Sequence, residues 1–393
     1  MLNCARPANH IFMIYFDNNA TTSVVPEVFD AMMPFLGSSY ANPSSGHSFG
    51  QQGRQAVDKA RESVADLLGA RDPNEIVFTS CGTESDNWSI LGALKASPVK
   101  NHIITTRVEH EAVRKVCQNL ESKGYRVTWI DVDEEGDLDI DALTNSLGEE
   151  TAVVSVMLAN NETGVLFPIE EIGNIIKERS SALFHVDGVN AVGKIPIDLK
   201  NTEVDLFSLS AHKFHGPKGI GALYIREGVK LPSHFIGGGQ ESGRRAGTEA
   251  VHQIAGLGAA AEFVKNMSLM ENVRKLRDRL ETDILKNIPN SRLNGTSNPA
   301  KRLPNTSNIS FENTNGEMIM HRLDELGICV STGSACHSGS HTASSVLQAM
   351  DVPYSYAMGS MRFSLGRTNT QDEVDTVLAA LPSIINGLKA RAA

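Results

Sequence analysis

The stretch DLFSLSAHKFHGPKGIGALYIRE, residues 205–227, joins two short apolar runs through a polar, glycine-rich segment. The runs DLFSL and GALYI have the composition of buried β-strands. Lys213 lies between two histidines, directly after the first run and just before the glycines. Most lysines are solvated surface residues, so this position alone leaves the role of Lys213 open. The neighbouring segments indicate what the lysine does.

Similar short runs occur along much of the chain before this stretch. They are EIVFTS, HIITTRV, RVTWIDV, AVVSVMLA and ALFHVDG, and helix-length segments separate most of them. Upstream, the segment GRQAVDKARESVADLLGA places Ala56, Ala60 and Val64 on one helical face, and Gly69 stands where a helix C-cap is wanted. This alternation predicts an α/β fold whose large domain has a mainly parallel sheet covered by helices on both faces.

The pattern changes beyond about residue 255. An amphipathic helix, VRKLRDRLETDILKNI, is followed by a polar connection rich in Pro and Asn and by the strand-like runs TSNISFE and GICVST. We therefore predict a large cofactor-binding domain over residues 23–257. A smaller α+β domain is expected from residues 1–22 and 258–393. The first 12 residues lack the features of a secretory signal and are interpreted either as a dispensable extension or as the result of a wrongly assigned start site.

Composition excludes several classes of function. The 393 residues carry a net charge of −10, which argues against nucleic acid or an anionic membrane as a partner. No apolar stretch is long enough to cross a bilayer. The cysteines are scattered, odd in number and form no C-x-x-C pair, which argues against a disulfide framework and a zinc site. They are Cys4, Cys81, Cys117, Cys329 and Cys336. We expect a reducing compartment and a cytoplasmic protein without a bound metal.

Polar residues follow five of the predicted strands at the point where each run ends. They include Gly82 and Thr83 after EIVFTS, His110 after HIITTRV, Asn161 after AVVSVMLA, Asp187 after ALFHV, and Ser210, His212 and Lys213 after DLFSL. The carboxyl ends of parallel strands share one edge of a sheet, where ligands bind. The sequence therefore predicts a ligand site at this edge.

The residue types at this edge suit pyridoxal 5'-phosphate. A lysine in a partly desolvated site can form a Schiff base with the cofactor's aldehyde. Gly82 and Thr83, at a strand-to-helix turn, can direct backbone N–H groups and a hydroxyl at its phosphate. Asp187 can pair with the pyridine nitrogen and His110 can stack on the ring. Each residue alone also fits a structural role, such as a turn former or an N-cap; the combination favours the cofactor site.

The chain resembles the NifS-like cysteine desulfurases of the class V aminotransferase family, which are fold-type I pyridoxal-phosphate enzymes. The resemblance covers nearly the whole chain and rests on the segments YFDNNATT, NPSSGHSFG, VFTSCGTESDN, EHEAV, ANNETG, HVDGVNAVGK, SAHKFHGPKGIGALY, GGGQESGRRAGTE, STGSACHSG and MRFSLGRTN. It implies a homodimer that converts L-cysteine to L-alanine. It also implies that the sulfur passes as a persulfide to an acceptor, such as an iron–sulfur scaffold protein.

The resemblance also implies roles for particular residues. It assigns Lys213 as the Schiff-base lysine, His110 as the stacking histidine and Asp187 as the pyridine partner. It implies that the phosphate is contacted by Gly82, Thr83, Ser210, Ala211 and His212, and by Thr248 reaching across to the neighbouring subunit. Asn161 and Arg362 resemble positions that contact cofactor and substrate, and a guanidinium there can hold an amino-acid carboxylate bidentately.

Cys336 matches the family's nucleophilic cysteine. It lies in STGSACHSGSHTAS, residues 331–344, where small and polar residues without apolar periodicity predict a mobile loop. A buried structural cysteine is expected in an apolar run instead, as with Cys329 in GICVST. The implied chemistry is attack of the Cys336 thiolate on the substrate sulfur.

Two positions depart from the usual family pattern. Asn190 stands where a glutamine commonly contacts the cofactor's ring hydroxyl, and we expect Asn190→Gln to retain the cofactor at least as well. His337 follows the nucleophile where Thr or Ser is usual; its imidazolium would favour a thiolate, but it equally fits a solvated histidine.

Three alternatives stay open. Some selenocysteine lyases carry a similar ACHS segment, so a preference for selenocysteine is the nearest alternative. An ordinary aminotransferase would share Lys213 and Asp187 but would have no use for a loop cysteine. A scaffold-binding protein with an inactive cofactor site would lack the visible absorption of the bound cofactor.

Overall fold

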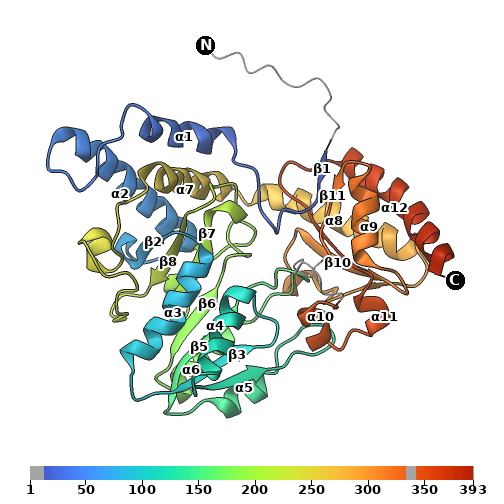
Figure 1. Cartoon of the computed structure of the whole chain (residues 1–393), viewed down its shortest axis with the longest axis horizontal. Helices are drawn as coiled ribbons and strands as arrows, with labels where there is room; N and C mark the ends of the chain where they lie inside the picture. Colours follow the sequence, from blue (N-terminus) through green and yellow to red (C-terminus); the bar gives the residue numbers. More distant parts are fainter. Residues whose placement is uncertain (1–12, 333–341, 393) are drawn as a thin grey trace.

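The computed structural model describes residues 13–332 and 342–392, shown in colour in Figure 1. Its largest sheet has seven strands in the order β2-β8-β7-β6-β5-β3-β4. The strands are β2 (Ile76–Thr79), β3 (His102–Thr106), β4 (Arg126–Ile130), β5 (Thr151–Met157), β6 (Leu183–Asp187), β7 (Leu206–Ser210) and β8 (Gly221–Ile225). Strand β8 runs antiparallel to both of its neighbours, β2 and β7, whereas the other neighbouring pairs are parallel. The α/β fold with a mainly parallel sheet is confirmed.

Helices cover both faces of this sheet. They are α1 (Pro26–Leu36), α2 (Ser48–Leu68), α3 (Gly82–Ala96), α4 (Glu111–Glu121), α5 (Ile140–Ser146), α6 (Ile169–Arg179) and α7 (Val251–Val264). Successive strand residues point to opposite faces. Accordingly, Ile103 of β3 packs with α3 and α4, whereas Ile104 belongs to the main core, which includes Ile172 of α6.

Helix α2 shows how local sequence sets the limits of an element. His47 precedes it, and its Nδ1 accepts a hydrogen bond from the N–H of Gly50. The helix ends at Gly69, whose φ of +61° lies in the left-handed region that glycine adopts without strain. A Cβ at Gly69 would also lie 2.6 Å from Asp198 Oδ1. The predicted helix and its glycine C-cap are confirmed.

Most of the remaining elements are centred on a second hydrophobic cluster, whereas the two short helices between residues 345 and 357 pack into the main core. In chain order, the remaining elements are β1 (Ile14–Tyr15), α8 (Ser268–Asn287), β9 (Ser291–Leu293), β10 (Thr306–Phe311), α9 (Gly316–Asp324), β11 (Ile328–Cys329), α10 (Ser345–Ala349), α11 (Tyr354–Ala357), β12 (Ser360–Ser364) and α12 (Gln371–Ala392). Strands β12, β10 and β9 form one sheet, and β1 pairs with β11 in another. Ile14 and Phe16 share the cluster with residues between Met270 and Ile385. This cluster joins the two ends of the chain.

The junction between the predicted domains falls within a helix. The predicted division lies after residue 257, whereas α7 continues to Val264 and packs against α1 and α2. Val264 belongs to the main core. The division itself stays a prediction. Within residues 13–332 and 342–392, no helix combines the length and the apolar character needed to span a membrane.

Candidate functional site

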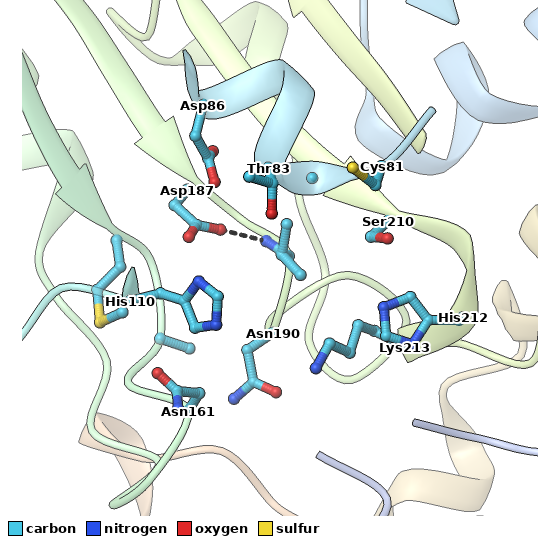
Figure 2. A pocket seen from close by; sticks show the side chains of 14 residues that line it. Cys81, Thr83, Asp86, His110, Asn161, Asp187, Asn190, Ser210, His212 and Lys213 are labelled. Atoms are coloured by element: carbon cyan, nitrogen blue, oxygen red, sulfur yellow. Dashed lines mark hydrogen bonds between the residues drawn. The ribbon is translucent and has the colours of Figure 1, made fainter. Parts of the chain in front are cut away.

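The carboxyl ends of five strands meet at one pocket of about 270 Å³ (Figure 2). Its lining residues are Cys81, Gly82, Thr83, Asp86, His110, Met157, Ala159, Asn161, Asp187, Val189, Asn190, Ser210, His212 and Lys213. These residues follow or end β2, β3, β5, β6 and β7. Segments far apart in the sequence therefore contribute to one cavity, as the strand-end pattern predicts.

Lys213 projects into the pocket from the short 3-10 turn Ala211–Lys213, which follows β7 directly. Its Nζ donates hydrogen bonds to the backbone oxygens of Asn19 at 2.6 Å and Ala20 at 3.0 Å. Burial, aided by the nearby Arg362 cation, lowers the pKa of Lys213 to about 8. The uncharged, nucleophilic amine is therefore far more accessible near neutral pH than in an exposed lysine.

Asp187 ends β6, and its carboxylate forms no ion pair with a lysine or arginine in residues 13–332 and 342–392. Among the described residues its side chain receives one hydrogen bond, from the N–H of Val189 to Oδ1 at 2.9 Å. Burial raises the pKa of Asp187, and the nearby Asp86 acts in the same direction. A cation in the pocket would stabilise the ionised carboxylate.

His110 precedes helix α4 and lies across the pocket from Lys213 in Figure 2. Its Nδ1 accepts a hydrogen bond from the N–H of Ala112 at 3.2 Å. Burial lowers the pKa of His110, which favours the neutral imidazole. Because Nδ1 accepts, the proton of the neutral ring lies on Nε2.

The first turn of α3 lines one end of the pocket. The preceding residue, Cys81, makes no side-chain capping bond, so the first N–H groups of this 15-residue helix remain for a ligand. A Cβ on Gly82 would lie 2.6 Å from Val189 Cγ2, which explains the glycine. Ser210 lies beside this turn, whereas His212 lies next to Lys213 in the same pocket (Figure 2), and burial lowers the pKa of His212 to about 4. The turn suits a phosphate group.

Together these features fit pyridoxal 5'-phosphate. The carboxylate of Asp187 can take a protonated ring nitrogen, and the first turn of α3 can take the phosphate. Lys213 supplies the amine for the aldehyde. His110 has the neutral, flat side chain that stacking on the ring needs.

The other predicted site residues lie elsewhere. Ala211 begins the turn that carries Lys213 and is fully buried. Thr248 is exposed and lies outside the pocket lining. Arg362 of β12 also lies outside the lining; it donates to Asp17 Oδ1 at 2.8 Å and to the oxygen of Asn161 at 3.0 Å. Cys336 and His337 lie outside the described residues.

Asp86 is a pocket residue that the sequence reasoning missed. It is 1% exposed, its Oδ1 has no hydrogen-bond partner within the part of the chain that the structure describes, and that oxygen lies 3.5 Å from His185 Nε2. The His185 Nε2 atom instead bonds to Ser208 Oγ at 3.0 Å. Burial raises the pKa of Asp86 to about 7. The sequence contains a signal for this position. Asp86 follows Thr83 by three residues in a helix, so both residues lie on the same face of α3.

The substitution Asp187→Asn is expected to lower the rate of the cofactor-dependent reaction by at least about a hundredfold, because a neutral amide no longer stabilises a protonated ring nitrogen. Steady-state kinetics with saturating pyridoxal phosphate provide the measurement. Asp205→Asn is the matched control: Asp205 is also buried, but it pairs with Lys177 away from the pocket. Equal losses in the two variants would contradict a specific role for Asp187.

Comparisons with known proteins agree with this site. The model of the family "Aminotransferase class-V" matches residues 14–377. The "Cysteine desulfurase" of Trichormus azollae is 54% identical over 380 residues, which cover 96% of this chain and 94% of that protein. The "Cysteine desulfurase NifS" of Azotobacter vinelandii is 50% identical over 378 residues, which cover 96% and 93% of the two proteins.

A solved structure shows the same architecture. The structure described as "NIFS-LIKE PROTEIN" superposes with a TM-score of 0.89 at 39% sequence identity. The match covers 96% of this chain and 100% of that one. The similarity therefore extends over both hydrophobic clusters of the fold.

Proposed function

The chain belongs to the class V aminotransferase family and, within it, to the NifS-like cysteine desulfurases, and we propose that it converts L-cysteine to L-alanine with pyridoxal 5'-phosphate as cofactor and Cys336 as sulfur carrier. One observation carries the proposal: Lys213, Asp187 and His110 line one pocket in a chain 54% identical to a cysteine desulfurase.

The pocket residues would hold the cofactor by complementary groups. Gly82, Thr83, Ser210 and His212 would bind the phosphate, with Ala211 setting the turn between them. Asp187 would hold the ring nitrogen in its protonated form, His110 would cover the ring, and Asn161 and Asn190 would contact its polar edge. When bound, pyridoxal phosphate supplies an electron sink for the charge that develops at the substrate's α carbon.

The protein's own groups then move protons and sulfur. With its lowered pKa, the Lys213 amine can accept the α proton of the substrate and return a proton. The Cys336 thiolate attacks the substrate sulfur, so that an S–S bond forms while the C–S bond breaks. The electron pair of the broken bond stays with the substrate carbon, which takes up a proton to become the methyl group of alanine. Cys336 retains the persulfide.

Arg362 is proposed to bind the substrate carboxylate. Arg362 is only 6% exposed and its guanidinium is held by Asp17 and Asn161, while its Nε has no hydrogen-bond partner among the described residues. This buried donor suits a carboxylate that enters from the pocket.

The substitution Arg362→Lys is expected to raise KM for L-cysteine by about tenfold or more, because an ammonium lacks the planar fork of the guanidinium. Cofactor absorption should persist. Arg302→Lys is the control: Arg302 is also buried and pairs with Glu281. An unchanged KM in Arg362→Lys would contradict carboxylate binding.

The active unit is proposed to be a homodimer. One face of α1 exposes Phe29, Met33 and Leu36 to 54%, 46% and 57%, at helical spacing. Such an apolar stripe on a helix needs a covering partner. Thr248 is exposed and outside the pocket of its own chain, which supports a contact with the partner's phosphate.

The sulfur acceptor is proposed to be a scaffold protein of iron–sulfur cluster assembly, as the resemblance to the NifS-like cysteine desulfurases implies. A cytoplasmic location is supported by the described cysteines Cys81, Cys117 and Cys329, all of which are free thiols.

Substrate comparison tests the proposal. Purified protein with added pyridoxal phosphate is supplied with L-cysteine, L-selenocysteine, or L-alanine plus 2-oxoglutarate. The desulfurase predicts alanine from L-cysteine at the highest kcat/KM. A much higher kcat/KM for L-selenocysteine would instead identify a lyase, and glutamate from 2-oxoglutarate would identify an aminotransferase.

A further inference from the structure

Lys194 is a buried lysine close to the pocket and without an acidic partner. It is 7% exposed, and among the described residues the charged groups that act on it are cations and not carboxylates. Its Nζ instead donates to two amide oxygens, Asn190 Oδ1 at 2.7 Å and Asn19 Oδ1 at 3.0 Å. Burial lowers the pKa of Lys194 well below its usual value, and the cations of Lys213 and Arg362 act in the same direction.

Both asparagines are connected to the site. The backbone oxygen of Asn19 accepts the 2.6 Å hydrogen bond from Lys213 Nζ. The Asn19 Nδ2 group donates to the oxygen of Asn161 at 3.2 Å. Asn190 lines the pocket, between Asn161 and Lys213 in Figure 2. Lys194 therefore lies one hydrogen bond away from two segments that shape the cofactor site.

These contacts fix the orientation of the Asn190 amide. Its Nδ2 donates to the backbone oxygen of Asn160 at 3.3 Å, and a carbonyl oxygen can only accept. Its Oδ1 faces the Lys194 amine, which donates. The Nδ2 group has two hydrogens, so one remains for a ligand in the pocket. Without Lys194, Oδ1 would be a buried acceptor lacking its 2.7 Å partner, and only the longer contact with Asn160 would hold the amide in place.

We propose that Lys194 is a positioning residue of the cofactor site, which holds the Asn190 amide as a donor toward the cofactor and the Asn19 segment against Lys213. The inference rests on the proposed function, since it needs a cofactor in the pocket. A purely structural role is disfavoured because a methionine of similar length would occupy the same space without the cost of burying an amine.

The test is Lys194→Met in the full-length protein. Pyridoxal phosphate is titrated into protein freed of cofactor, and its affinity is read from the visible absorption band. We expect affinity to fall by about tenfold, because the hydrogen bonds of a buried amine are lost. The thermal unfolding midpoint without cofactor should change little, because relief of the buried amine offsets the loss of its two hydrogen bonds. Unchanged affinity for pyridoxal phosphate would overturn the proposal. A fall in both this affinity and the unfolding midpoint would also overturn it.

A double-mutant cycle separates positioning from general damage. Asn190→Ala should itself weaken cofactor binding, and adding Lys194→Met should then produce much less additional loss than Lys194→Met alone, because part of the lysine's effect passes through that amide. Fully additive losses would overturn the proposal.

Lys100→Met is the matched control. Lys100 Nζ donates to the oxygen of Thr151 and to Ser181 Oγ, near the amino ends of β3 and β5, at the edge of the sheet opposite the pocket. The Lys100→Met variant should bind pyridoxal phosphate as tightly as the wild type does. A tenfold loss of affinity in this variant would overturn the proposal. If the wild-type protein itself bound no pyridoxal phosphate, the proposed function would fail together with the inference. Binding by the wild type and equal binding by Lys194→Met would remove the inference alone.

Discussion

Lys213→Ala is expected to lower the rate of alanine formation from L-cysteine by at least about a thousandfold, since the variant loses both the amine that attaches the cofactor and the base that moves the α proton. The expectation rests on the position of Nζ in the pocket and on its lowered pKa of about 8. The variant should also lose the visible absorption that arises when the cofactor is joined to the lysine.

The controls for this variant use the same region of the chain. Lys218→Ala removes a nearby exposed lysine and should leave the rate unchanged. Added methylamine should restore part of the Lys213→Ala rate, because a small amine can occupy the vacated space and accept a proton. Turnover near the wild-type level in Lys213→Ala, at full occupancy with pyridoxal phosphate, would refute the assigned role.

Cys336→Ser is expected to abolish persulfide formation and to reduce alanine release to background, because a hydroxyl does not accept sulfur from the substrate. The cofactor site should remain intact, so L-cysteine should still change the absorption of the bound cofactor. Rapid mixing with a single equivalent of L-cysteine, followed by mass spectrometry of the intact chain, measures the sulfur gained by the protein.

Cys329→Ser is the matched control for that experiment. Cys329 lies in β11, and burial raises the pKa of its thiol, which disfavours the nucleophilic thiolate. Wild type and Cys329→Ser should each gain one sulfur atom, whereas Cys336→Ser should gain none. A persulfide on the Cys336→Ser protein would place the sulfur carrier on another cysteine.

The strands and the place of the site could be predicted because both depend on local patterns. Each of the seven runs became a strand at the expected place, and the residues after β2, β3, β5, β6 and β7 meet in the pocket. The antiparallel direction of β8 was not predicted, because sequence periodicity carries no information on the direction of neighbouring strands.

The contacts behind the pocket could not be predicted because they depend on packing between distant segments. Lys213 is held by the carbonyl oxygens of Asn19 and Ala20, more than 190 residues away. Backbone carbonyls are present at every residue, so no residue type marks the two that bind. The partners of Lys194 likewise become visible only when residues near 19 and 190 are brought together.

Arg362 illustrates the limit for a residue identified by resemblance. Its side chain type suits a substrate carboxylate, but its pairing with Asp17 joins β12 to the start of the chain and is a property of the folded state. The residue type shows that Arg362 can bind a carboxylate. It does not show which residues the guanidinium contacts in the folded protein.

The most direct measurement is product analysis of the reaction with L-cysteine and dithiothreitol, comparing wild type and Cys336→Ser. The account predicts alanine and sulfide in equal amounts from the wild type, no pyruvate, and neither product from the variant. Pyruvate and sulfide from both proteins would show elimination by the cofactor site without a persulfide, and would contradict the assignment as a cysteine desulfurase.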